Sequence, residues 1–394
     1  MKKTGLLSFG LLCLLLSTVG YSQIHYRASL SSSIYALETP EAVQRGDYYQ
    51  GVQLRLYPFS NRQIYFNTYF RLAKLGSSAW EEKFYNSYIH WNSQDKRWRV
   101  RVGRQFLFQG VVNGTMDGVT FTGNISPKLK FTVVGGVEAP YQREFRVVNT
   151  DSAFWGGVLN FKPTRNHRIQ FSYINRTRNN ESIWNLLGLT FTGRYRSNWI
   201  YLFQLEHNLQ SGKLQGVRSR VTYNQDKWSL SGEINSQKPR VFEDSFFRIF
   251  VLNPFVQLRT AATYEFNTIQ LGVQYLFTKY EEDQTNQIIA TVGKRWGVIG
   301  VIYQNGFAGD NIGLYGDVRY PLRPWLSIKL KSSYYNYQRH AVLVGEEATA
   351  FSAGVILRPY PSLSVHAEVQ QGINSFYKND FRGLFRVQYL IQKQ

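Results

Sequence analysis

The chain has 394 residues, is 16% aromatic, and carries 46 Lys and Arg residues against 26 Asp and Glu residues, a net charge of +20. Its length would suit two or three soluble domains, but no linker, low-complexity stretch or change of composition divides it. The basic residues occur singly or at every second position rather than in runs, which argues against a nucleic-acid-binding tail.

Residues 1–22 have the layout of a secretory signal peptide. Lys2 and Lys3 give a positive start, an apolar stretch follows, and small residues precede the expected cleavage after residue 22. The apolar stretch is too short to cross a bilayer as a helix. Cys13 is the one cysteine and lies within this stretch. The expected mature chain, residues 23–394, is therefore a single exported domain without a disulfide.

Apolar and polar residues alternate along nearly all of the mature chain. Residues 97–102, for example, place Arg97, Arg99 and Arg101 on one side of a strand and three apolar residues on the other. Successive side chains of a strand point to opposite faces, so each such segment has one apolar and one polar face. We count about 22 segments of roughly nine to thirteen residues, the length that a tilted strand needs to cross a membrane. In chain order they start near Tyr26, Asp47, Gln63, Phe84, Arg97, Asp117, Lys128, Ala153, His167, Asn185, Asn198, Lys213, Lys227, Val256, Thr268, Thr285, Gly297, Asn311, Trp325, Ala348, Ser362 and Phe376.

The connections between these segments alternate in length. Tight polar turns, such as residues 58–61 and 93–96, alternate with longer connections, such as residues 105–116 and 138–150. Short turns at one rim and long loops at the other are typical of outer-membrane barrels. In lipid every backbone polar group needs an internal partner, and only closure removes the edges of a sheet. The sequence therefore predicts an all-β fold, a transmembrane antiparallel β-barrel of about 22 strands (range roughly 16–22) without a separate plug domain.

Soluble β-folds are the alternatives to this barrel. A β-helix or β-propeller would show a repeat at a fixed period, and none is visible. Two or three β-sandwiches would need linkers and fewer Tyr and Trp residues at the strand ends.

The polar face of each strand is expected to line the lumen. Basic residues outnumber acidic residues on this face, and rings of Arg and Lys favour anions. One hypothesis is therefore a water-filled path biased toward anionic solutes; the other is that the basic residues pair with acidic residues across strands and simply fill the lumen. The predicted pore-lining residues are Arg55, Arg71, Arg97, Arg99, Arg101, Arg218, Arg220, Arg259, Arg319, Lys329, Lys331, Arg382 and Arg386.

Loops that fold inward would narrow such a lumen. The first candidate is a loop over residues 105–116, with Arg104, Gln105 and Asp117 as constriction residues. The second is the charged connection over residues 237–255. For each of them, an outward surface loop is the alternative.

Residues 84–137 carry a recognisable order of features, namely Tyr85-Asn86-Ser87-Tyr88, then Val102-Gly103-Arg104-Gln105, then a glycine-containing loop, then Asp117-Gly118-Val119. In this respect the stretch resembles the alginate-export-type and related large outer-membrane porins. The resemblance implies a passive channel for anionic sugars or small solutes with a basic lumen. The end of the signal peptide, Ser22-Gln23, is similar to that of exported proteins of Bacteroidetes-type bacteria.

The sequence shows no pattern typical of catalysis or cofactor binding. The six histidines are scattered without metal-ligand spacing, and no nucleophile elbow, phosphate loop or dinucleotide fingerprint occurs. We therefore expect no metal, no cofactor and no enzymatic activity. His366 and Glu368, two residues apart on one strand face, support a minor enzymatic alternative.

Our leading prediction is a porin-like channel of the bacterial outer membrane for passive diffusion of small polar or anionic solutes. The main alternative is a barrel that does not conduct and serves as a scaffold or partner in an envelope secretion or assembly machine. The expected partners are outer-membrane lipid and small solutes, with a homo-oligomer left open and no nucleic acid.

Overall fold

The computed structural model describes residues 24–38, 44–58, 63–140, 143–144, 151–238, 254–306, 309–338, 346–374 and 380–393. The predicted signal peptide lies outside these residues. The strands are β1 (His25–Glu38), β2 (Gln44–Tyr57), β3 (Ile64–Leu75), β4 (Glu81–Asn92), β5 (Trp98–Gln109), β6 (Val112–Ser126), β7 (Leu129–Glu138), β8 (Ser152–Thr164), β9 (His167–Arg178), β10 (Glu181–Tyr195), β11 (Trp199–Asn208), β12 (Lys213–Gln225), β13 (Trp228–Gln237), β14 (Phe255–Phe266), β15 (Ile269–Lys279), β16 (Gln284–Lys294), β17 (Gly297–Gly306), β18 (Asp310–Arg323), β19 (Leu326–Gln338), β20 (Glu346–Tyr360), β21 (Leu363–Ile373) and β22 (Asp380–Lys393).

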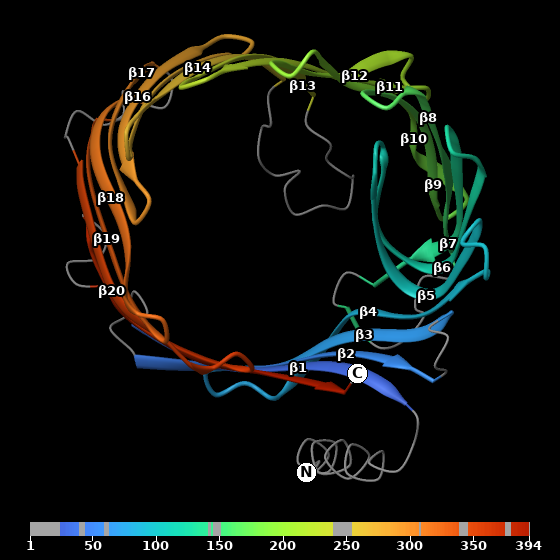
Figure 1. Cartoon of the computed structure of the whole chain (residues 1–394), viewed down its shortest axis with the longest axis horizontal. Coiled ribbons are helices and arrows are strands. Elements are labelled where there is room, and N and C mark those ends of the chain that lie inside the picture. Colours follow the sequence, from blue (N-terminus) through green and yellow to red (C-terminus); the bar gives the residue numbers. More distant parts are fainter. Residues whose placement is uncertain are drawn as a thin grey trace.

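These 22 strands form one closed antiparallel barrel (Figure 1). Each strand pairs with its neighbours in the sequence, and β1 pairs with β22 over a register that runs from Tyr26–Lys393 to Leu37–Arg382. The predicted fold class and strand number are thereby confirmed. No helix long and apolar enough to cross a membrane occurs in the part of the chain that the structure describes.

Alternation of side chains gives the wall two distinct faces. On β8, Trp155, Leu159 and Phe161 are exposed, whereas Phe154 and Val158 on the opposite face are buried. Other strands present exposed apolar side chains at every second position in the same way. A continuous apolar exterior of this kind is suited to lipid rather than to water.

Exposed tryptophans gather at the rim with the short turns. Trp199 and Trp228 begin β11 and β13, and their rings pack on Tyr223 and Tyr264 of the next strands, with ring centroids 4.6 and 4.5 Å apart. Aromatic side chains form such girdles at the edges of the apolar band in membrane barrels. The exposed tryptophans at this rim are Trp91, Trp98, Trp199, Trp228, Trp296 and Trp325.

The regular wall is interrupted where β5 leaves β4. These two strands pair only from Asn92–Arg99 to Ser87–Arg104, although β5 continues to Gln109. At the point of departure Gly103 has a φ of +123°, and a Cβ there would lie 2.4 Å from the Ser87 carbonyl oxygen. A side chain at this position would therefore prevent the close approach of the two strands.

Two further glycines continue this row across the sheet. Gly103, Gly118 and Gly136 lie directly opposite one another on β5, β6 and β7. A Cβ at Gly118 would lie 2.2 Å from the Gly135 carbonyl oxygen. The three backbones can thus approach closely, and the sheet can bend sharply along the row. Just beyond it, β5 leaves β4 after Arg104 and β6 leaves β7 at Met116, and the two strands continue as a hairpin.

Candidate functional site

The segment expected to be a constriction loop is a hairpin of regular strands. Residues 105–116 continue β5 and β6, with pairs from Gln105–Met116 to Gln109–Val112, and Gly110 makes the turn with a φ of +59°. The expectation of a loop here was wrong. Strand structure persists because alternate side chains of the hairpin, such as Leu107, are buried against the barrel wall.

The hairpin lies inside the barrel, and its tip reaches the middle of the wall. The Val111 N–H donates to Ser172 Oγ on β9 at 3.1 Å, and a Cβ at Gly188 on β10 would lie 2.7 Å from Val111 Cγ1. Ser172 and Gly188 face inward, because their neighbours Phe171 and Leu187 are exposed on the outside. Both lie near the centre of their strands. Figure 1 shows the β5–β6 hairpin (teal) within the ring, beside β9 and β10.

An apolar core fixes the hairpin to the wall. Met116 is fully buried, and Phe154 on β8 is almost so. The inner face of the wall under the hairpin is therefore apolar, which differs from the expectation of a mostly polar inner face. The core consists of Leu107, Val111, Val112 and Met116 from the hairpin and Val134, Phe154, Val158, Ile174, Trp184 and Leu186 from the wall.

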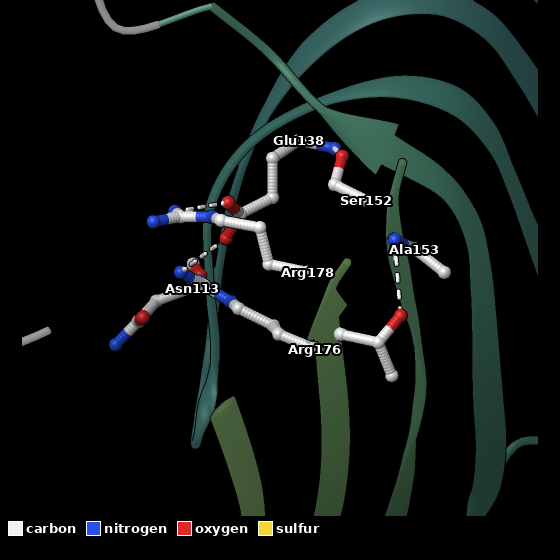
Figure 2. Close-up of polar contacts among 7 residues, drawn as sticks. Asn113, Glu138, Ser152, Ala153, Arg176 and Arg178 are labelled. Atoms are coloured by element: carbon white, nitrogen blue, oxygen red, sulfur yellow. Dashed lines mark hydrogen bonds and ion pairs between the residues drawn. The ribbon is translucent and has the colours of Figure 1, made fainter. Parts of the chain in front are cut away.

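A polar clamp lies beside this core (Figure 2). Glu138, the last residue of β7, accepts hydrogen bonds from Arg176 Nη1 at 3.4 Å and from Arg178 Nη2 at 2.7 Å. Arg176 Nη2 also donates to the carbonyl oxygen of Asn113 in the hairpin. The guanidinium of Arg176 lies 4.7 Å from the ring centroid of Phe154. Through Arg176, the clamp ties the backbone of the hairpin to the wall.

The three predicted constriction residues meet at the base of the hairpin. Arg104 and Asp117 form a two-pronged ion pair, with Nε–Oδ1 and Nη2–Oδ2 distances of 2.7 Å, and both side chains are buried. Arg104 Nη1 also donates to the carbonyl oxygens of Phe84 and Glu144. The side-chain amide of Gln105 is buried. It donates to the carbonyl oxygen of Gly118 and accepts from the hydroxyl of Thr120, both on β6. These residues hold the bend in place. The second predicted constriction, over residues 237–255, lies mostly outside the described residues.

Several predicted pore-lining residues lie on the inner wall of β1–β3 and β22. Arg71 and Arg386 line one concavity, and Arg55 lines an adjoining one together with Arg27 and Arg358. The two concavities share Ser29, Gln53 and Gln388, and Ser31 and Ser33 continue the floor along β1. Small serine side chains between longer neighbours thus leave a hydroxyl-lined groove along most of the strand. Three guanidinium groups of the inner wall lie over tyrosine rings: Arg55 over Tyr65, Arg71 over Tyr49 and Tyr85, and Arg101 over Tyr88.

Other predicted pore-lining residues pair with acidic neighbours. Arg218 Nη2 lies 2.9 Å from Glu233 Oε2, and Arg220 Nε lies 4.0 Å from the same oxygen. Arg259 lies opposite Glu233 on the next strand, but its guanidinium donates to Gln274 Oε1, from Nε at 3.1 Å and from Nη2 at 2.6 Å. Lys329 pairs with Glu368, Lys331 with Asp317, and Arg382 with Asp380. Arg97 precedes β5 and pairs with Asp95 in the turn, while Arg99 and Arg319 lie in β5 and β18.

His366 and Glu368 lie close together in a hydrogen-bonded cluster. Glu368 accepts from Lys329 Nζ at 2.9 Å, Ser352 Oγ at 2.8 Å and Gln370 Nε2 at 2.8 Å, and lies 3.1 Å from His366 Nε2. The Ser352 hydroxyl thus bonds to the carboxylate, whereas a catalytic triad requires the imidazole between them. In the described part of the chain, no group of three or more His, Cys, Asp or Glu residues is placed to hold a metal ion.

An inward position for residues 105–116 was one of the two alternatives drawn from the sequence, but their strand structure and their apolar packing on the wall were missed, although two signals were present. Strands β8 and β10 carry apolar residues on both faces, such as Phe154 beside Trp155 and Leu186 beside Leu187. An apolar inner face in a barrel indicates that something covers it. The second signal is the set of glycines near residues 103, 118 and 136, which mark the bend.

These observations define a class of protein, a wide transmembrane β-barrel with one of its own hairpins fixed inside the lumen. No protein-family model matches the chain, and no curated protein matches it. Among solved structures, it is similar to the translocation pore of the P pilus usher PapC, with a TM-score of 0.50, 7% identity, and coverage of 94% of this chain and 100% of that one.

Two further solved structures show a weaker likeness. One is OpdQ of Pseudomonas aeruginosa, with a TM-score of 0.48, 11% identity, and coverage of 95% of this chain and 100% of that one. The other is a BenF-like porin of Pseudomonas fluorescens, with a TM-score of 0.49, 8% identity, and coverage of 95% and 100%. At identities this low, the comparisons bear on the barrel fold alone.

Proposed function

We propose that this protein is a channel of the bacterial outer membrane through which small polar and anionic solutes diffuse passively. The observation that carries the proposal is the hairpin held inside a closed 22-stranded wall at mid-height. Barrels of about 16–18 strands already leave an aqueous channel, so a wider ring needs an internal element to limit what passes. A hairpin fixed by an apolar core provides such an element.

The preference for anions rests on the inner wall of β1–β3 and β22. Arg55, Arg71 and Arg386 line concavities there, and Asp47 is the one carboxylate among their lining residues. Asp47 itself pairs with Arg45 at 2.8 Å. Fixed cations along a water-filled path raise the local concentration of anions. The resemblance of residues 84–137 to alginate-export-type porins agrees with this class of solute, and no covalent chemistry is required of the protein.

Conductance across planar bilayers tests the proposal. We expect the purified protein to open a stable ion-conducting path whose reversal potential in a KCl gradient shows anion preference. Arg71→Gln together with Arg386→Gln should reduce that preference, because both cations of one concavity are removed. Arg97→Gln is the matched control, since Arg97 lies in a turn with a largely exposed side chain.

Two outcomes would contradict the proposal. One is a folded protein that never conducts. Co-purification of a stoichiometric partner with such a barrel would favour the scaffold alternative. The other is a conducting protein whose ion preference is the same in the double variant and in the wild type. This result would show that Arg71 and Arg386 do not set the preference for anions.

A further inference from the structure

Two phenylalanines of the hairpin present their rings to the lumen. Phe106 and Phe108 are 59% and 80% exposed, and Phe108 is the most exposed of the large hydrophobic side chains in the described part of the chain. The opposite face of the same hairpin, with Leu107 and Met116, is buried against the wall. Because the hairpin lies on the inner side of β9, its other face looks into the lumen and not toward lipid.

The two rings are nearly parallel, and the strand that carries them is held in place. Their centroids are 6.4 Å apart, and their planes are inclined by only 13°. Single exposed hydrophobic residues are ordinary on protein surfaces, but adjacent aromatic rings inside a solute path call for a physical explanation. The apolar core and the bond from Val111 to Ser172 fix the strand that carries them. A surface ordered in advance loses little conformational entropy when a ligand binds.

The remaining groups on this face of the hairpin are polar but carry no net charge. Thr115 lies directly opposite Phe106, and Asn113 lies opposite Phe108. Arg104 and Asp117, the next pair toward the base, neutralise one another in their ion pair. The face therefore combines two apolar rings with a hydroxyl and an amide, both of which donate and accept hydrogen bonds.

We infer that this face of the hairpin binds uncharged saccharides. A β-glucopyranose ring has C–H groups on its flat faces and hydroxyls around its edge. It can thus pack against the exposed rings of Phe106 and Phe108 while its hydroxyls bond to the amide of Asn113 and the hydroxyl of Thr115. The inference goes beyond an anion-selective path, because it assigns a neutral solute class to the hairpin. It rests on the proposed function for passage, but binding does not depend on conduction.

Binding of cellohexaose to the detergent-solubilised protein tests this inference. We expect saturation-transfer NMR and calorimetry to detect binding to the wild type. Phe106→Ala together with Phe108→Ala should weaken it at least about tenfold. Phe108→Trp should retain binding, since an aromatic face remains. Phe161→Ala together with Phe171→Ala is the matched control, because these side chains are exposed on the outside of the wall.

Each result either supports or overturns the inference. Equal cellohexaose affinity in the Phe106 and Phe108 double variant, or no binding to the wild type at millimolar cellohexaose, would overturn it. Binding of benzoate without binding of cellohexaose would overturn the saccharide assignment. Cellohexaose should also block single-channel current in the wild type. A barrel that binds cellohexaose but never conducts would contradict the proposed channel and leave the binding face intact, so the two failures are distinguishable.

Discussion

Glu138 shows how one residue ties the hairpin to the barrel wall. Its carboxylate accepts from Arg176 and Arg178, and its own backbone N–H donates to Ser152 Oγ at 3.1 Å. Arg176 in turn reaches the backbone of Asn113. Loss of the carboxylate charge would leave two neighbouring guanidinium groups without this counter-charge.

Glu138→Gln is therefore expected to destabilise the protein by roughly 1–3 kcal/mol, because one partner is removed from a largely buried charge cluster. The control is Asp317→Asn, whose partner is Lys331. These two side chains are 43% and 45% exposed, so the free energy of unfolding should fall by less than about 1 kcal/mol. Unfolding by urea in detergent, followed by circular dichroism, measures both. Equal midpoints for the two variants would show that the clamp adds nothing to stability.

At the scale of single residues, the sequence identified residues that matter in the structure but not the interactions that they make. Arg104, Gln105 and Asp117 were predicted as constriction residues because they border the long connection over residues 105–116, whereas in the structure they stabilise the bend. The pairing of Glu138 with Arg176 could not be predicted, since it depends on how three strands and an inward hairpin pack. The alternation of residues tells which face a side chain lies on, but not which charge it meets across the sheet.

The β5–β6 hairpin is the element in which the sequence pattern and the structure differ most. Side-chain burial still alternates along residues 105–108, but the two strands change from the barrel wall to a hairpin whose buried face packs against that wall. Gly103 and Gly118 allow this change by permitting close backbone contacts at the bend. Local patterns do not specify the direction in which a hairpin leaves a sheet, because the direction depends on the apolar inner surface of β8–β10, on which the hairpin packs.

A pair of cysteines can test where the hairpin tip lies. A Cβ at Gly188 would lie 3.5 Å from Val111 Cβ, which is within the range found in disulfides, about 3.5–4.5 Å. Val111→Cys with Gly188→Cys should therefore form an intramolecular disulfide, and the one native cysteine, Cys13, lies in the predicted signal peptide. Thiol titration and mass spectrometry with and without reductant measure it.

The matched control for this pair is Val111→Cys with Leu187→Cys, because Leu187 is exposed on the outside of the wall. This second pair should stay reduced under the same oxidising conditions. Equal cross-linking of the two pairs, or none in the first, would contradict the inward position of the tip.

For the molecule as a whole, the sequence was sufficient to predict the wall and insufficient to predict the lumen. The number of strands and the antiparallel order follow from the repeated period of two and from the turns, which are local features. What occupies the interior depends on contacts between distant strands, such as Val111 with Ser172, which are 61 positions apart. The lumen therefore has to be described from the packing of the complete ring.

The hairpin should control the conductance of the barrel without controlling its ion preference. Replacement of residues 105–116 by a two-residue Asn-Gly turn would join Arg104 to Asp117, which already lie opposite each other. We expect a higher single-channel conductance, because the element that occupies the lumen at mid-height is gone. The anion preference should persist, since Arg71 and Arg386 line the wall on other strands. The same turn placed over residues 209–212, between β11 and β12, should leave conductance unchanged. If the shortened hairpin conducted like the wild type, the narrow part of the path would have to lie elsewhere.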